Sequence, residues 1–217
     1  NGSAMRVSPI GWWFGPTSDL YAEAEKTAAC THNHEEGILG AQAVAFSIYD
    51  ARELRKNLNG EPMTEEYLLK YGLDHGIGLY EEFPQNFKID LEQYRNKFDE
   101  TCQGTVPVAL WIALHSKSFE DAIRQAVSLG ADADTLGAIV GSIAEPLWGI
   151  PEWMKEKALS YLPDDMKAVI MEFHTRLKRL RKLSKKCQFY AIGEFTSVDD
   201  SDKIAYDIER EWMHDLA

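Results

Sequence analysis

Apolar residues return at steps of three and four along most of this sequence, while the alternating apolar and polar order of β-strands is scarce. A side chain repeats its direction every 3.6 residues in an α-helix, so this spacing gathers the apolar residues of each segment on one side. The sequence therefore predicts an all-α fold. The expected helices cover residues 19–30, 36–58, 107–115, 119–129, 135–148, 151–160 and 164–183, with a loop of short turns at 72–86.

The composition fits one compact globular domain or two small ones, with 217 residues of which 45% are apolar and 27% charged. Thirty-five acidic side chains against 23 basic ones give a formal charge of −12, which repels phosphate backbones, so we expect no nucleic-acid partner. No apolar run reaches the ~18–20 residues that span a bilayer, and the first residues lack the order of a signal peptide. The three widely spaced cysteines match neither a disulfide framework nor a zinc site. These features predict a soluble cytoplasmic protein with reduced thiols and no membrane partner.

The sharpest local signal is residues 130–135, Gly-Ala-Asp-Ala-Asp-Thr, between the end of one expected helix and the start of the next. Residues two apart on a regular helix point about 200° away from each other, so Asp132 and Asp134 meet only if this segment is a turn. Two carboxylates and a hydroxyl are hard ligands that suit Mg²⁺, Mn²⁺ or Ca²⁺. The alternative is plain helix capping, because Asp at a helix amino terminus interacts with free N–H groups and the helix dipole. The spacing leaves both interpretations open.

The helix expected after this motif has one nearly bare side and one apolar side. The bare side holds Gly137, Ala138, Gly141, Ser142 and Ala144, and the apolar side holds Leu136, Ile139, Val140, Ile143 and Leu147. We expect such a helix to be buried all round at the centre of the molecule. A carboxylate pair at its end would then be partly desolvated and would need a cation or hydrogen-bond donors, which argues against idle capping.

Three further clusters carry weaker signals. Residues 1–6, Asn-Gly-Ser-Ala-Met-Arg, can present backbone N–H groups and a guanidinium to a phosphate, although Gly-Ser runs near a terminus are usually linkers. Residues 31–36, Thr-His-Asn-His-Glu-Glu, offer Thr31 or Asn33 as a helix cap and His32 or His34 as donors to an anion, although such histidines are more often surface groups. Residues 102–107, Cys-Gln-Gly-Thr-Val-Pro, are either an anion site or a simple junction before a helix.

Taken in this order, the four clusters resemble the ADP-ribosylglycohydrolase family, which includes dinitrogenase reductase-activating glycohydrolase and the ADP-ribosyl hydrolases. The stretches that carry the resemblance are NGSAMRVSPIG, THNHEEGILGAQA, CQGTVP with FEDAIRQAVSLG, and GADADTLGAIVGSIAEPLWGIP. They cover most of residues 1–160 in the spacing of the short bacterial members. The resemblance implies an orthogonal all-α bundle that binds two Mg²⁺ or Mn²⁺ ions. It also implies hydrolysis of the bond between ADP-ribose and a protein side chain or small acceptor.

The resemblance further implies roles for individual residues. Asp132, Asp134 and Thr135 match the carboxy-terminal metal ligands of the family, and the two aspartates would be the catalytic carboxylates. Residues expected to bind ADP-ribose, the first four of them in the loop that holds the phosphates and ribose, are Gly2, Ser3, Met5, Arg6, His32, Gly104 and Thr105.

The sequence departs from the family pattern in two places. Ala131 and Ala133 replace a glycine and a Ser or Thr, a mild change that keeps the metal ligands. The amino-terminal third of the family, with its Thr-Asp-Asp-Thr metal motif, has no counterpart before Asn1, so we expect a truncated member or fragment that holds at most one cation, weakly. Little or no activity is then expected from this chain alone, and the alternative is a catalytically inactive ADP-ribose-binding or interaction module. Apolar faces left around Trp12, Trp13 and Phe14 would favour self-association.

The last stretch differs in composition, so we expect two parts: a helical domain over 1–175, the carboxy-terminal two thirds of the family domain, and a charged helical extension over 176–217. Basic side chains crowd one helical tail at Arg176, Lys178, Arg179, Arg181, Lys182, Lys185 and Lys186, before an acidic end at Asp199, Asp200, Asp202 and Asp207. The simpler interpretation is a solvated helix whose basic face pairs with the acidic end, and the alternative is an anion-binding role. Residues 196–201, Thr-Ser-Val-Asp-Asp-Ser, resemble the missing metal motif only superficially, and we interpret them as part of the acidic tail.

Overall fold

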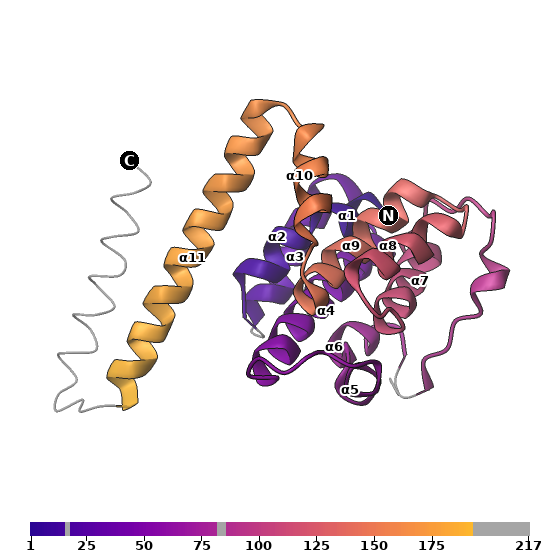
Figure 1. Ribbon diagram of the computed structural model, residues 1–217. Coiled ribbons are helices and arrows are strands. Elements are labelled where there is room, and N and C mark those ends of the chain that lie inside the picture. The colour runs from indigo at the N-terminus through magenta and orange to yellow at the C-terminus, as the bar shows by residue number, and fades with distance from the viewer. Residues whose placement is uncertain (16–17, 82–85, 193–217) are drawn as a thin grey trace. The chain divides into compact units, whose positions relative to one another are not determined.

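The computed structural model describes residues 1–15, 18–81 and 86–192, and these residues form helices joined by turns and loops (Figure 1). No β-strand occurs among them, which confirms the predicted all-α fold. Across the same ranges, no helix has the length and apolar character needed to cross a membrane.

The helices follow one another closely along the chain. Their bounds are α1 Gly2–Arg6, α2 Ser8–Trp13, α3 Ser18–His32, α4 Glu35–Asn57, α5 Glu65–Tyr71, α6 Asp74–Ile77, the 3₁₀ helix η2 Leu91–Gln93, α7 Cys102–Leu114, α8 Phe119–Ser128, α9 Ala133–Trp148, α10 Glu152–Ser160 and α11 Asp164–Ile192. The chain divides into two compact units, Asn1–Lys157 and Ala158–Ala217, and the candidate site lies entirely in the first.

Helix α4 is the centre of the first unit, where it contacts α1, α2, α3, α6, α7 and α9. Small residues such as Ala41, Ala43 and Ala45 are fully buried along it, so neighbouring helices approach its backbone closely. One close approach is at Gly40, where an added Cβ would lie 2.6 Å from Sγ of Cys102 on α7. Helix α4 thereby brings the starts of α1 and α7 to one place. Among the described side chains, Cys102 and Cys30 are free cysteines.

Helix α9 packs against α7 and α8 through its apolar side. Ile139, Val140 and Ile143 are fully buried there, and each buried aliphatic side chain of this size contributes ~1.5–3 kcal/mol. The bare side behaves differently, because Ala138 is exposed and an added Cβ at Gly137 would meet no atom within 4 Å. The expectation that this helix is buried all round is therefore wrong, and one face of α9 is open.

Two segments expected to be irregular are helical. Within residues 1–6, Gly2–Arg6 form α1 and not a linker, and the N–H groups of Ala4 and Met5 donate to the carbonyl of the N-cap residue Asn1 at 3.0 and 3.2 Å. Helix α7 begins five residues before the proline that was expected to open it, and Pro107 lies inside the helix. Proline costs one intrahelical hydrogen bond, but the helix is apolar and largely buried, so packing outweighs this loss.

The loop expected at 72–86 contains one helical turn, α6, and the unexpected helix α5 precedes it, capped by the Thr64 hydroxyl.

The apolar face expected around Trp12, Trp13 and Phe14 is partly covered, and Trp12 and Phe14 pack against the core. The Arg52 guanidinium also lies over the Trp12 ring, 5.8 Å from its centre. These three side chains are thus half-buried, and self-association stays a prediction.

The second unit is dominated by α11, which runs unbroken across the domain boundary expected between residues 175 and 176. Its side chains pair along the helix, for example Lys167 with Asp164 and Arg176 with Glu172. These pairs link basic and acidic residues within one helix. The acidic end at 199–207 and the segment 196–201 lie outside the described residues, as do the side chains of Lys185 and Lys186.

Candidate functional site

The turn that leads into α9 places Asp132 at the amino end of a helix. Gly130 adopts φ +66°, a left-handed conformation that favours glycine, and Asp132 follows as the N-cap residue with φ −69° and ψ 76°. The Asp132 side chain makes no capping hydrogen bond within the described part of the chain. Plain capping, the simpler of the two interpretations of this motif, is therefore not what the Asp132 carboxylate does.

The turn brings the carboxylates of Asp132 and Asp134 together. A side-chain hydrogen bond with Asp132 is the largest of the contacts that hold the pKa of Asp134 below its ordinary value, followed by a hydrogen bond from the backbone N–H of Thr135. That N–H lies 3.0 Å from Asp134 Oδ1. Asp134 is exposed, Asp132 is half-buried and Thr135 is buried. Two hard anionic ligands thus lie side by side at an accessible helix end, with a hydroxyl next in the chain.

The side chain of Asn1 joins this turn to the start of α7. Its Nδ2 lies 3.3 Å from Asp132 Oδ2, 3.2 Å from Thr105 Oγ1 and 3.2 Å from the Asp99 carbonyl oxygen. An amide has two N–H groups, so the three acceptors share them. Asn1 is therefore the polar centre of the site.

The start of α7 is built around Gly104 and Thr105. The N-cap residue Thr101 accepts a hydrogen bond from the Gly104 N–H at 3.1 Å, and Thr101 itself donates to the Asp99 carboxylate. Gly104 has no room for a side chain, because an added Cβ would lie 2.0 Å from Asp99 Oδ2. The Thr105 hydroxyl is buried and donates to the Asp99 carbonyl at 3.1 Å. Both predicted residues are thus fixed by Asp99 beside Asn1 and Asp132.

His32, at the end of α3, packs on the start of α1. An added Cβ at Gly2 would lie 2.9 Å from two atoms of the His32 ring, so the ring covers this glycine. Burial is the largest cause that lowers the pKa of His32, and the Arg6 charge acts in the same direction. The N-cap residue of α4 is His34, which accepts from the Glu36 N–H at 3.2 Å, whereas Thr31 or Asn33 was expected in this role.

The remaining residues of α1 point in different directions. The exposed Arg6 guanidinium donates to Thr31 Oγ1 at 2.6 Å and to the Thr27 carbonyl, and it lies 3.3 Å from Cys30 Sγ. Met5 is partly buried against the core. Ser3 is fully buried, and its hydroxyl donates to the Gly37 carbonyl at 2.7 Å. Ser3 can therefore serve a ligand only through its backbone.

The structure thus brings all four sequence clusters into one region. Sequence reasoning missed Asn1 as the residue that links them and Asp99 as the group that fixes the start of α7. An Asp-x-Thr ahead of a helix is a capping signal that identifies Asp99 and Thr101 as local structure, but the contacts with Asn1 span about a hundred residues and leave no local pattern.

A small cavity of about 20 Å³ lies beneath the site, lined by Asp99, Thr105, Asp132 and neighbouring apolar side chains. It has the size of about one water molecule, whereas nucleotide-sized ligands need several hundred Å³. Such a ligand would lie over the cavity, along the surface. The described residues contain no group of three or more His, Cys, Asp or Glu side chains placed to hold a metal ion.

Comparison with known proteins gives a consistent result. The sequence profile of the ADP-ribosylglycohydrolase family matches residues 1–187. An uncharacterized protein of Archaeoglobus fulgidus is 30% identical over 187 residues, which cover 82% of this chain and 60% of that protein. The ADP-ribosylarginine hydrolase Tri1 of Pseudomonas putida is 27% identical over 180 residues, covering 74% of this chain and 42% of that enzyme. The chain thus spans between two fifths and three fifths of the length of these relatives.

Proposed function

The chain belongs to the ADP-ribosylglycohydrolase family, and from this premise we propose that it binds ADP-ribose and hydrolyses the bond linking it to a protein side chain or small acceptor. The observation that carries the proposal is the meeting of three distant segments at the Asn1 side chain, with the His32 ring on the adjacent Gly2 and an Asp132 carboxylate that does not cap its helix. In the proposed reaction the bond from the ribose anomeric carbon to the acceptor breaks, a water oxygen bonds to that carbon, and the proton of the water leaves with the acceptor.

The carboxylate pair is the proposed cation site. Asp132, Asp134 and Thr135 supply two carboxylates and a hydroxyl, all hard oxygen donors of the kind that Mg²⁺ and Mn²⁺ prefer. A cation bound between the two acids would relieve the repulsion between their neighbouring negative charges. A bound cation would supply polarisation of the ribose hydroxyls and of water at the anomeric centre. Each such ion takes about six oxygens, so three protein donors suit one ion completed by water.

The protein side chains would orient the ligand around this site. Asn1 holds Asp132 in place through its amide, while Arg6 supplies a positive charge near His32 for the phosphates of ADP-ribose. Gly137 and Ala138 follow Asp134 by three and four residues, so they share its side of α9. Since Gly137 has open space around it, the ligand can lie along this face beside the carboxylates.

A catalytically inactive ADP-ribose-binding module is the second candidate function. It is favoured by the small donor set, since the described residues hold no group of three His, Cys, Asp or Glu side chains suited to a metal. In that case the contacts of Asn1, Arg6 and His32 would serve binding alone.

The test uses residues 1–217 with ADP-ribosylarginine, the linkage in the name of one relative. We expect one weak Mn²⁺ or Mg²⁺ site by calorimetric titration and slow, cation-dependent release of ADP-ribose. Asp134→Ala should abolish cation binding and the release of ADP-ribose. The control Asp164→Ala removes an exposed first-turn aspartate of α11 and should change neither cation binding nor release. Binding of free ADP-ribose without turnover, unaffected by cations, would favour the inactive module. Two tight cation sites would contradict the single-ion proposal.

A further inference from the structure

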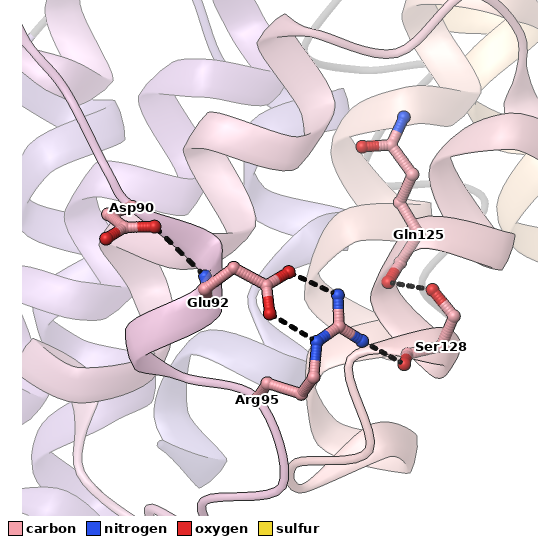
Figure 2. A network of polar contacts seen from close by, with 5 residues as sticks. All are labelled: Asp90, Glu92, Arg95, Gln125 and Ser128. Carbon is pink, nitrogen blue, oxygen red and sulfur yellow. Dashed lines mark hydrogen bonds and ion pairs between the residues drawn. The ribbon is translucent and has the colours of Figure 1, made fainter.

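Residues 90–101, here called the strap, run from the N-cap of η2 to the N-cap of α7 and contact both sides of the candidate site. Near the beginning of the strap, Arg95 holds the Glu92 carboxylate with two nitrogens, Nε to Oε2 at 2.8 Å and Nη2 to Oε1 at 2.6 Å. The remaining nitrogen, Nη1, donates to the Ser128 carbonyl oxygen at 3.1 Å (Figure 2). That carbonyl ends α8, where helix carbonyls lack partners within the helix, so Arg95 caps α8.

The next residue ties the strap to the turn between α8 and α9. The Asn96 N–H donates to the Leu129 carbonyl at 2.9 Å. Asn96 and Gly130 both adopt left-handed backbone conformations, with φ 56° and 66°, and an added Cβ at Gly130 would lie 2.3 Å from Asn96 Oδ1. The Asn96 side chain therefore packs directly on Gly130, beside the backbone hydrogen bond to Leu129. Asp132 follows Gly130 by two residues, so the strap touches the turn that places the carboxylate pair.

The far end of the strap fixes the other side of the site. The Asp99 carbonyl accepts from Asn1 Nδ2 and from the Thr105 hydroxyl, and the Asp99 carboxylate accepts from the Thr101 N–H at 2.8 Å. Thr101 in turn caps α7 at Gly104. One continuous segment of twelve residues thus joins the α9 turn to the start of α7.

We propose that the strap fixes the position of Asp132 relative to Thr105, with Arg95 as the positioning residue. For its effect on cation binding and catalysis, this inference rests on the proposed function. Arg95 acts through the last carbonyl of α8 and the following turn, and it touches neither Asp132 nor a ligand. Cation ligands must hold their places to within ~0.5 Å, so loosening this turn weakens the site without removing any donor. Arginine is required because a lysine ammonium cannot hold Glu92 with two nitrogens while reaching Ser128 with a third.

The test compares Arg95→Ala with the control Arg124→Ala in the full chain. Arg124 lies on α8 and contacts Glu120 with two nitrogens at 2.8 and 2.6 Å, so its loss removes a similar surface ion pair away from the strap. Two quantities are measured: amide hydrogen exchange of residues 129–135 without metal, and the Mn²⁺ dissociation constant. Arg95→Ala should raise the exchange rate and the Mn²⁺ dissociation constant about five-fold each, because one capping hydrogen bond and an exposed ion pair are lost. Arg124→Ala should change neither the exchange rate nor the dissociation constant.

Further measurements separate positioning from general loss of stability. The two alanine variants should have Tm values within about 4 °C of each other, and Arg95→Lys should behave like Arg95→Ala. Where ADP-ribosylarginine is turned over, Arg95→Ala should lower kcat and leave KM unchanged, since Arg6 and His32 are intact. Equal exchange in Arg95→Ala and Arg124→Ala would overturn the inference, as would weaker Mn²⁺ binding without faster exchange. If the unmodified chain binds no Mn²⁺, the proposed cation site fails, and exchange of the turn alone still decides the role of the strap.

Discussion

The carboxylates of Asp50 and Asp132 both lie at the amino end of a helix, that of Asp50 at the start of α6 and that of Asp132 at the start of α9, but their surroundings are very different. Asp50, on α4, is 8% exposed and accepts hydrogen bonds from the His75 N–H at 2.9 Å and from the His75 ring at 2.6 Å, at the start of α6. Asp132 is half-buried, and its contacts are the Asn1 amide at 3.3 Å and the neighbouring carboxyl of Asp134. The Asp50 carboxylate is thus surrounded by hydrogen-bond donors of His75, whereas the Asp132 carboxylate has one donor and lies beside a second acid.

The difference shows what separates a structural carboxylate from a candidate ligand. Burial raises the pKa of Asp50, and the His75 ring with the N–H groups of His75 and Gly76 opposes that rise. Its acceptor capacity is therefore used within the fold, where it fastens α6 to α4. At Asp132 and Asp134, most of the oxygen lone pairs have no fixed donor in the described contacts, so they remain available to a cation. The number of hydrogen-bond donors that already contact a carboxylate therefore distinguishes a structural carboxylate from a candidate metal ligand.

Asp132→Ala is the substitution with the largest expected effect, and it tests directly whether Asp132 is a metal ligand or a structural carboxylate. It should weaken Mn²⁺ binding at least ~100-fold, because one of the two carboxylates is lost. The free energy of unfolding without metal should change by less than ~0.5 kcal/mol, since the side chain does not cap α9 and lies beside another acid. Electron paramagnetic resonance titration with Mn²⁺ and urea unfolding measure these quantities. A loss of ~2 kcal/mol in stability with Mn²⁺ binding intact would place Asp132 in the structural class.

Asp50→Ala should give the opposite pattern. Removing a buried carboxylate leaves the N–H groups at the start of α6 without their acceptor, so the free energy of unfolding should fall by about 2–3 kcal/mol. Mn²⁺ affinity measured on the folded protein should stay unchanged, because Asp50 contacts no residue of the candidate site in the described structure. Urea unfolding with and without Mn²⁺ checks both. Unchanged stability would mean that α6 is fastened by packing alone.

Much of the fold follows from local sequence, because the periodic apolar residues of α3, α4, α8 and α9 mark faces that must be buried together. The errors occur where long-range contacts override local preference. Gly104 and Pro107 are typical of a loop, yet α7 begins before both, since Thr101 caps it and Asp99 occupies the space beside Gly104. Residues 1–6 have the composition of a linker, yet burial of Ser3 and Ala4 makes them helical.

The candidate site was less predictable than the fold. The motif 130–135 identifies the carboxylates, but the same residues are typical of an ordinary cap, and only the backbone angles of Asp132 and the reach of Asn1 distinguish the two. The strap shows the same limit, because Arg95 and Asn96 contact α8 and Gly130 from more than thirty residues away. A single sequence carries no periodic signal for such contacts.

The smallest expected effect is the pH dependence of the free energy of unfolding that Asp50 contributes, measured against Asp50→Asn. It tests whether burial or hydrogen bonding dominates at the structural carboxylate. Because burial raises the folded-state pKa of Asp50 above the ordinary 3.8, the fold favours the protonated acid. Relative to Asp50→Asn, the stability contributed by Asp50 should therefore be fully present below pH 3.8 and should decline as pH rises through the folded-state pKa.

His75 provides a second variant for the same measurement. Burial also raises the pKa of the neighbouring Asp74, and the His75 ring opposes the rise at both acids. His75→Gln should therefore move the decline in stability to higher pH. Urea unfolding of the three proteins at several pH values between about 3.5 and 7 measures the difference. A contribution that grows with pH would mean that the hydrogen bonds of His75 outweigh burial, and Asp50 would then be held as an anion.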